Sequence, residues 1–177
     1  MAKLEPGKGS GSRTSGPVDP QRLVGAWQLV RWYTTYEDGT VTEPLGPGAE
    51  GLLVYTADGW MSAAIMAAGR AQLSRGNPRA APVAERAAAF DGFFGYCCRW
   101  RVVGRTVEHR VTLSHNPGLV GTVQVRRIQF SGRRLTLSAE EPVAGGRRVH
   151  RLQWRPAVQP KDSEVAMRRV AAARKRT

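Results

Sequence analysis

The residues most able to take part in chemistry are a histidine and a tyrosine set in short runs of alternating apolar side chains. In the run from Thr106 to Ser114, His109 shares one side with three aliphatic residues, Val107, Val111 and Leu113. Successive side chains of a strand point to opposite faces, and the apolar face is expected to turn inward. His109 should therefore lie inside the protein, either as a hydrogen-bonded core group or as a group that polarises a bound molecule.

Tyr55 is the second candidate, because its hydroxyl could hydrogen-bond to a carbonyl group of a bound molecule. Tyr55 and His109 are the predicted catalytic residues. Large apolar and aromatic side chains of the surrounding segments are predicted to bind substrate: Leu53, Trp60, Met61, Ile65, Phe93, Tyr96 and Trp100. Small residues close to them favour a cavity over a solid core, which is the alternative: Ala63, Ala64, Gly92 and Gly95.

Other kinds of chemistry find little support in the sequence. The three histidines, His109, His115 and His150, lack the spacing of metal ligands, and no carboxylate cluster accompanies them. There is no glycine-rich nucleotide fingerprint after a predicted strand, and no serine lies in a nucleophile elbow. We therefore expect no metal and no cofactor, and the pattern disfavours hydrolase, kinase and dehydrogenase activity.

The two cysteines, Cys97 and Cys98, are adjacent. In a strand they would point to opposite faces and could not easily form a disulfide. Buried thiols in a reducing compartment are the expected state, with a catalytic thiolate as the alternative. This agrees with the cytoplasmic location that is expected because the sequence shows neither a secretory signal nor a membrane span.

The chain carries a net charge of +13 at pH 7, which raises the question of nucleic-acid binding. Every cationic residue from 23 to 160 is an arginine, and these arginines are scattered singly or in pairs. A nucleic-acid surface usually gathers its cations into one patch or stripe. The charge pattern therefore disfavours nucleic acid as a partner.

Nine segments have the composition and turn signals of β-strands: 27–37, 41–43, 51–56, 60–66, 95–103, 106–114, 122–130, 134–139 and 147–155. Their regular spacing leaves no room for parallel crossovers, which predicts an all-β fold, either an antiparallel up-and-down barrel or a sandwich. The alanine-rich segment 82–90 predicts a short helix. In a barrel this helix would lie across one open end as a lid.

The two ends of the chain lack the strand pattern of the central segment. Residues 1–21 are predicted to be a flexible arm, residues 22–157 the β-domain, and residues 158–177 a basic C-terminal helix or tail. No apolar run reaches the roughly 18 residues of a membrane span. The first residues lack the apolar core of a secretory signal.

The opening Gly25-Ala26-Trp27 resembles the Gly-x-Trp motif of lipocalins and other calycins. Further segments fall in the order seen in the bacterial and fungal lipocalin-like domain family: Gly51-Leu52-Leu53-Val54-Tyr55-Thr56, Asp58-Gly59-Trp60-Met61-Ser62, Ala89-Phe90-Asp91-Gly92-Phe93-Phe94-Gly95-Tyr96, Val107-Glu108-His109-Arg110-Val111 and Arg151-Leu152-Gln153-Trp154. This resemblance covers residues 23 to 156 and implies a single lipocalin-like β-barrel. It also implies that Trp27 closes the barrel floor against an arginine of the last strand, Arg151 or Arg155.

Proteins similar to this one often accompany natural-product pathways, especially polyketide pathways of actinomycetes, where some small barrels are cofactor-free cyclases. The resemblance therefore implies a cyclase or isomerase of antibiotic biosynthesis. The most specific form of this prediction is a pericyclase, which would catalyse the cycloaddition of a hydrophobic polyene. The alternative is a carrier that binds a small hydrophobic ligand without changing it. A cyclase and a carrier need the same cavity, so the sequence leaves both functions open. It also leaves open whether the protein forms a homo-oligomer.

Overall fold

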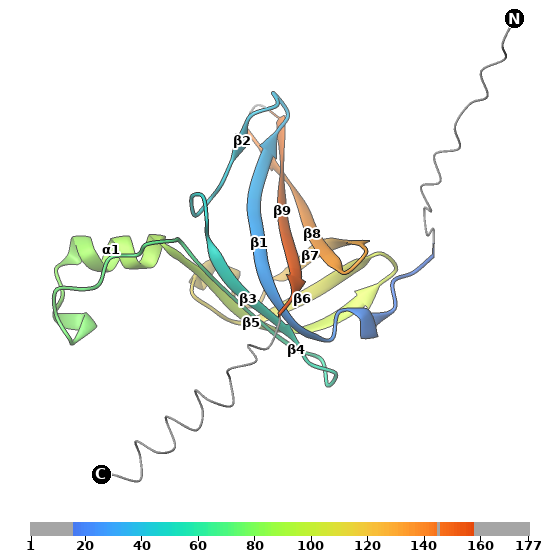
Figure 1. Ribbon diagram of the computed structural model, residues 1–177, viewed down its shortest axis with the longest axis horizontal. Coiled ribbons are helices and arrows are strands. Elements are labelled where there is room, and N and C mark those ends of the chain that lie inside the picture. Colours follow the sequence, from blue (N-terminus) through green and yellow to red (C-terminus); the bar gives the residue numbers. More distant parts are fainter. Residues whose placement is uncertain (1–15, 145, 158–177) are drawn as a thin grey trace, which may run out of the picture.

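The computed structural model describes residues 16–144 and 146–157, and in this part of the chain nine strands form one antiparallel sheet (Figure 1). The strands follow one another closely along the chain: β1 (Gly25–Tyr36), β2 (Val41–Thr42), β3 (Glu50–Tyr55), β4 (Trp60–Met66), β5 (Phe93–Val103), β6 (Thr106–Ser114), β7 (Val123–Ser131), β8 (Arg134–Val143) and β9 (Gly146–Pro156). The predicted all-β class is confirmed.

The sheet closes on itself, which decides between a barrel and a sandwich. Each strand from β3 to β9 pairs with its sequence neighbour, and β1 pairs with both β3 and β9. The closing ladder is long, since it runs from the Trp27–Pro156 pair to the Tyr36–Arg148 pair. The short β2 pairs only with β1, so eight strands make the closed, up-and-down barrel. Glycines with positive φ, Gly39 at 86° and Gly59 at 88°, form two of the tight turns.

Alternation along the strands places the core inside the barrel. In β4, Met61, Ala63 and Ile65 are buried, whereas the residues between them are exposed. The same alternation buries Leu53 and Tyr55 in β3. The buried apolar residues form a single cluster that extends around the barrel from β1 to β9.

A register shift in β6 changes which residues face inward. Cys97 pairs with Leu113 and Cys98 pairs with Val111, so Thr112 is an extra residue opposite β5. A bulge of this kind reverses the alternation beyond it. Val111 is 2% exposed, but Leu113 is 67% exposed. The prediction that Leu113 shares the inward face was therefore wrong.

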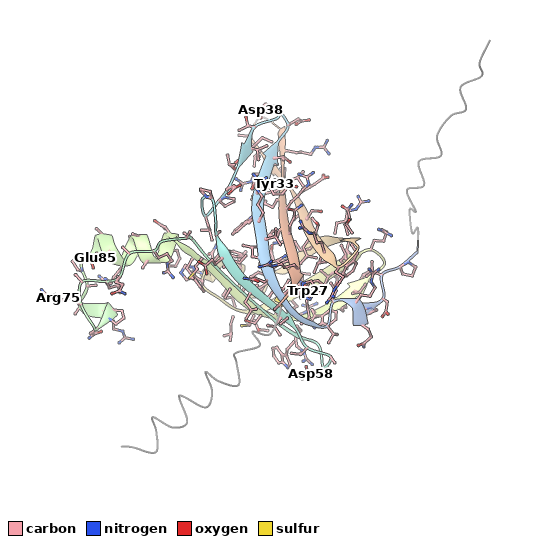
Figure 2. All side chains as sticks on the ribbon, in the orientation of Figure 1. Trp27, Tyr33, Asp38, Asp58, Arg75 and Glu85 are labelled. Carbon is pink, nitrogen blue, oxygen red and sulfur yellow. The ribbon has the colours of Figure 1, made fainter. Side chains whose placement is uncertain are left out.

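One end of the barrel is closed by the residues before β1. A short 3-10 helix, η1 (Pro20–Arg22), leads into the fully buried Leu23, whose carbonyl accepts a hydrogen bond from Trp27 Nε1 at 2.8 Å. Figure 2 shows Trp27 near this end, close to the turn that carries Asp58 and far from the turn that carries Asp38. Trp27 thus lies at the barrel floor.

The arginine near this floor comes from a different place than the resemblance implied. Arg155 donates a hydrogen bond to Gln28, and Arg151 donates one to Thr35. The guanidinium of Arg22 instead lies 3.9 Å from the ring centroid of Phe130, which packs against Trp27 at 6.2 Å. Near the floor, therefore, the arginine that stacks on an aromatic ring precedes β1, and its ring is that of Phe130, the neighbour of Trp27.

The predicted helix is present as α1 (Val83–Asp91), between β4 and β5. It lies at the side of the barrel next to β5 and projects away from it (Figure 1). The segment before it carries a 3-10 turn, η2 (Pro78–Ala80). None of the α1 residues is buried, so the expected lid across an open end is not seen. The predicted C-terminal helix falls outside the described residues.

The helices of the described part of the chain are all short. None of them is long and apolar enough to cross a membrane.

Candidate functional site

The barrel encloses a cavity of about 400 Å³, bounded by residues from β1 and from β3 to β9. Its inner wall is largely apolar and is made by Trp32, Leu53, Met61, Ala63, Ile65, Phe94, Leu137, Leu152 and Trp154. Polar and charged side chains complete the lining: Tyr96, His109, Asn116, Gln124, Arg126, Glu140, Glu141, Arg148 and His150. Such a cavity suits a small molecule with an apolar body and a few polar atoms.

His109 lies between two tyrosine hydroxyls at the base of this cavity. The hydroxyl oxygen of Tyr55 is 2.8 Å from His109 Nε2, and that of Tyr96 is 2.8 Å from His109 Nδ1. Three strands position the group: β3 carries Tyr55, β5 carries Tyr96 and the neighbouring β6 carries His109. Of the three, Tyr96 and His109 line the cavity, and Tyr55 lies behind them.

The need of each buried polar group for a partner determines which atoms donate and which accept in the Tyr55–His109–Tyr96 hydrogen bonds. Tyr55 is only 1% exposed, and His109 is the one hydrogen-bond partner of its hydroxyl among the described residues. If Nε2 carried the imidazole proton, the Tyr55 hydroxyl proton would be buried without an acceptor, at a cost of about 1–3 kcal/mol. With the proton on Nδ1, Tyr55 donates to Nε2 and Nδ1 donates to Tyr96. The Tyr96 hydroxyl then keeps its own proton to donate to a molecule in the cavity.

Burial keeps all three groups neutral. It lowers the pKa of His109 to about 3, helped by the positive charge of Arg126. It raises the pKa of Tyr96 to about 12 and that of Tyr55 well above its usual value. The imidazole is therefore an uncharged link between two phenols near neutral pH, and protonated His109 is excluded as a general acid there.

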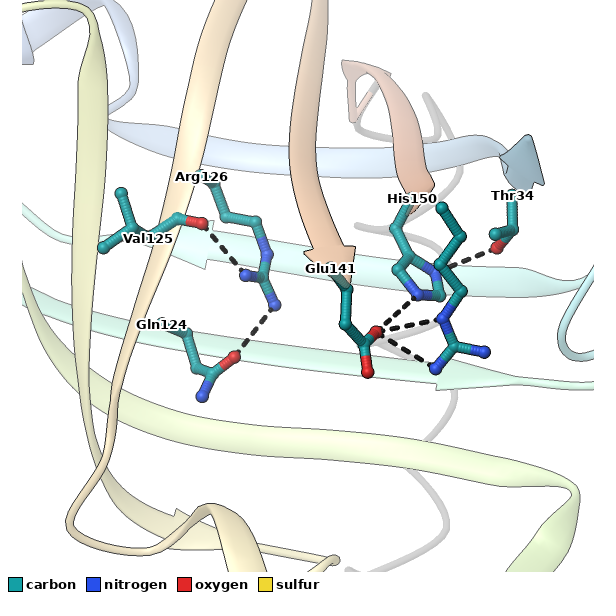
Figure 3. Close-up of polar contacts among 7 residues, drawn as sticks. Thr34, Gln124, Val125, Arg126, Glu141 and His150 are labelled. Atoms are coloured by element: carbon teal, nitrogen blue, oxygen red, sulfur yellow. Dashed lines mark hydrogen bonds and ion pairs between the residues drawn. The ribbon is translucent and has the colours of Figure 1, made fainter. Parts of the chain in front are cut away.

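A second polar group lies at the rim of the cavity and is internally paired. Glu141 of β8 accepts hydrogen bonds from Arg148 at 3.0 Å and from His150 Nε2 at 3.3 Å, while His150 Nδ1 contacts the Thr34 hydroxyl at 2.9 Å (Figure 3). Burial alone would raise the pKa of Glu141, but the hydrogen bond and charge of Arg148 lower it on balance. All of the contacts to Glu141 are to one carboxylate oxygen, Oε2, so Arg148, with a hydrogen bond from His150, neutralises the charge of Glu141.

Arg126 also lines the cavity, but it has no acidic partner among the described residues. Its guanidinium donates to its neighbour Val125 at the carbonyl (3.0 Å) and to Gln124 Oε1 (3.3 Å). In Figure 3 these contacts form a group separate from the contacts around Glu141. A cation is therefore held at the cavity by neutral groups alone.

The structure brings five of the predicted site residues to the cavity: Leu53, Met61, Ile65, Tyr96 and His109. Tyr55 is joined to them through His109 but does not reach the cavity wall itself. Of the small residues expected to leave space, Ala63 lines the cavity, while Ala64 is exposed on the outer face of β4.

Three predicted substrate-binding residues lie elsewhere. Trp60 is 46% exposed and stacks with Arg99 on the outside of the barrel. Phe93 is on the outer face of β5, near Arg70 and His115, because Phe94 and Tyr96 take the inner face. Trp100 packs edge-on against Tyr55 and donates to the Thr56 carbonyl below the cavity. Consistent application of alternation would have excluded Trp60 and selected Phe94.

The sequence analysis missed the charged part of the lining. Gln124 and Arg126 alternate with the exposed Val123 and Val125, so polar residues face inward and apolar ones outward in this part of β7. That inversion is visible in the sequence and is the signal of a polar patch in a barrel. Glu141 and His150 carry no comparable signal, since they come together only through the pairing of β8 with β9.

The two cysteines form no disulfide, and the expected burial holds for only one of them. Cys98 is buried and Cys97 is partly exposed. Burial raises the pKa of the Cys98 thiol to about 12, so this sulfur is a packing atom rather than a nucleophile. Across the described residues, no group of three or more His, Cys, Asp or Glu is arranged to hold a metal ion.

Comparison with known proteins agrees with this architecture. A family model described as a lipocalin-like domain matches residues 24–156, which include every strand of the barrel. No curated protein and no solved structure gives a significant match to the chain.

Proposed function

The chain belongs to the lipocalin-like domain family, and on that premise we propose that its barrel binds one small, mainly apolar molecule in the central cavity. The observation that carries the proposal is the cavity itself. A volume of about 400 Å³ with a wall of aliphatic and aromatic side chains lies within the range of small-molecule sites. A well-packed interior of this size would contain no such space.

The Tyr96 hydroxyl gives the bound molecule an orientation. Its own oxygen accepts from His109, so its proton points to an acceptor outside the Tyr–His–Tyr chain. A carbonyl or hydroxyl oxygen of the ligand would meet this donor at the base of the cavity, and the apolar remainder would lie along Leu53, Met61 and Ile65. This combination gives affinity through burial and specificity through one hydrogen bond.

The test is a fluorescence titration of the full chain with methyl cis-parinarate, a neutral polyene ester that fluoresces in apolar surroundings. The proposal predicts saturable binding of one ester per chain. Fluorescence that rises without saturation, or no change at all, would contradict it. The Trp60→Ala variant is a useful control, because Trp60 lies outside the cavity and its loss should leave the affinity unchanged.

A second candidate is a cofactor-independent cyclase or isomerase of natural-product biosynthesis, with cycloaddition of a polyene as its most specific form. The Tyr55–His109–Tyr96 chain favours it, because a buried hydroxyl polarised through a neutral imidazole can stabilise negative charge that develops on a carbonyl oxygen. The cavity would hold the flexible substrate in a reactive conformation. In this account Tyr96 contacts the substrate, and His109 and Tyr55 position the Tyr96 hydroxyl.

This candidate is tested with a linear trienone that cyclises slowly in water. We expect the protein to accelerate cyclisation and the Tyr96→Phe variant to lose about tenfold to a hundredfold of that acceleration. Equal rates of cyclisation with and without protein, together with saturable ester binding, would leave ligand binding as the function and remove the enzyme candidate.

A further inference from the structure

We propose that the ligand carries an anionic oxygen, as in a carboxylate or an enolate, and that this oxygen binds to the guanidinium of Arg126 near the Tyr96 hydroxyl. The proposal rests on the ligand-binding function above and adds the chemical class of the ligand.

The first observation is the placement of Arg126 on the inner face of the barrel. In the pairing of β6 with β7, Val107 lies opposite Arg126 and His109 lies opposite Gln124. Val107 and His109 are both buried inside the barrel, and Arg126 and Gln124 share their face. By contrast, the next residue, Arg127, is exposed on the outer face. The chain thus holds one arginine inside and one outside at adjacent positions.

The second observation is that no acid of the described residues neutralises Arg126. Glu141 is bound by Arg148 and His150, and Glu140 pairs with Arg147 at 3.6 Å. The acceptors that Arg126 does have, Gln124 Oε1 and the Val125 carbonyl, orient its guanidinium but carry no net charge. A half-buried cation that lacks a counter-charge gains more from an anionic ligand than from a neutral one.

The third observation concerns the unused hydrogen-bond groups of the cavity. The Tyr96 hydroxyl keeps a proton to donate, and the buried Nε1 atoms of Trp32 and Trp154, whose rings line the cavity, have no acceptor among the described residues. All of these groups are donors, as is the guanidinium. A ligand whose polar atoms are acceptors would complement these donors, whereas the two carboxylates of the lining, Glu140 and Glu141, are already paired with arginines.

Arg126 is also close enough to the Tyr–His–Tyr chain for its charge to act there. Its positive charge lowers the pKa of Tyr96, against the larger effect of burial, and it lowers the pKa of His109 as well. The same field would stabilise negative charge on an oxygen that accepts a hydrogen bond from Tyr96. Since both residues line the same cavity, the proposal places the anionic oxygen of the ligand where the charge of Arg126 and the hydroxyl of Tyr96 both act on it.

The test compares two probes with the same polyene chain, cis-parinaric acid and its methyl ester, which differ in the charge and in one methyl group. Both are titrated by fluorescence with the full chain near pH 7, where a carboxylic acid is ionised. We expect the wild type to bind the acid about tenfold or more tightly than the ester. Arg126→Gln should remove this preference. Arg127→Gln is the matched control, since it removes the same charge from the outer face of the same strand and should retain the preference.

The outcomes separate this proposal from the function on which it rests. If acid and ester bind equally well to the wild type, or if Arg126→Gln keeps the preference for the acid, the anionic ligand is ruled out while ligand binding stands. If neither probe binds the wild type, ligand binding fails and the charge preference fails with it. Because the acid–ester comparison on the wild type needs no variant, the test does not depend on the folding of Arg126→Gln.

Discussion

The Tyr55 hydroxyl and His109 Nε2 lie 2.8 Å apart inside the barrel, and each residue is only 1% exposed. This pair fixes the imidazole tautomer, because the buried hydroxyl needs an acceptor and Nε2 is the one it has among the described residues. The tautomer in turn leaves the Tyr96 proton for a ligand. The donor at the base of the cavity is thus set by a residue that does not touch the cavity.

Removal of the Tyr55 hydroxyl should reduce stability. In Tyr55→Phe, one ring nitrogen of His109 loses its buried partner, and we expect the free energy of unfolding to fall by about 1–3 kcal/mol. Tyr33→Phe is the control, because Tyr33 lies partly exposed beside Arg31 and should change stability by less than about 0.5 kcal/mol. Urea unfolding measures both. Equal effects of the two changes would argue against a buried hydrogen bond at Tyr55.

Acidification should destabilise the protein through His109. Its pKa falls from the ordinary value of 6.5 to about 3 on folding, so between these values the unfolded chain binds a proton that the folded chain does not. Stability should be greatest above about pH 6.5 and fall by about 1.4 kcal/mol per pH unit below it.

The measurement is the free energy of unfolding of wild type and His109→Gln between about pH 5 and pH 6.5. In this interval the carboxyl groups whose pKa values are lowered, Glu141 and Asp38, contribute little to the slope. His150, whose pKa is also lowered, is present in both proteins. The slope of the unfolding free energy against pH should be steeper for the wild type than for the variant, by an amount that corresponds to about one proton bound on unfolding. Identical slopes would show that His109 is not buried as a neutral group.

The bulge in β6 predicts opposite outcomes for two neighbouring aliphatic residues. Val111→Ala removes buried methyl groups and should cost about 1–3 kcal/mol of unfolding free energy. Leu113→Ala removes a larger side chain but from the outer surface, so it should cost less than about 0.5 kcal/mol. Thermal or urea unfolding of the two variants checks the register. A larger loss for Leu113→Ala would place the bulge elsewhere.

The fold was predictable because it depends on local patterns. Strand alternation and glycine turns such as Asp38-Gly39 and Asp58-Gly59 define the hairpins, and a chain of hairpins with one closing pair is a barrel. The placement of α1 was not predictable in this way. A helix with no buried residue has no strong apolar face that would fix it over the barrel mouth.

The site was predictable only in part, for a related reason. Leu53, Met61, Ile65 and His109 follow from alternation alone, which also excludes Trp60 from the interior. The roles within the site depend on pairing across strands, which alternation does not give. The sequence could not show that both nitrogens of His109 are occupied by tyrosines, and so could not assign the donor to Tyr96 in place of Tyr55 or His109.

The central claim is that a small molecule binds inside the barrel. The most direct test is to fill the cavity with a larger side chain and to measure the effect on binding. Ala63 lines the cavity and Ala64 points outward from the same strand, so Ala63→Phe and Ala64→Phe add the same ring inside and outside. In titrations with methyl cis-parinarate, Ala63→Phe should weaken binding by at least about tenfold, while Ala64→Phe should bind as the wild type does. Unchanged binding by a folded Ala63→Phe variant would contradict the claim.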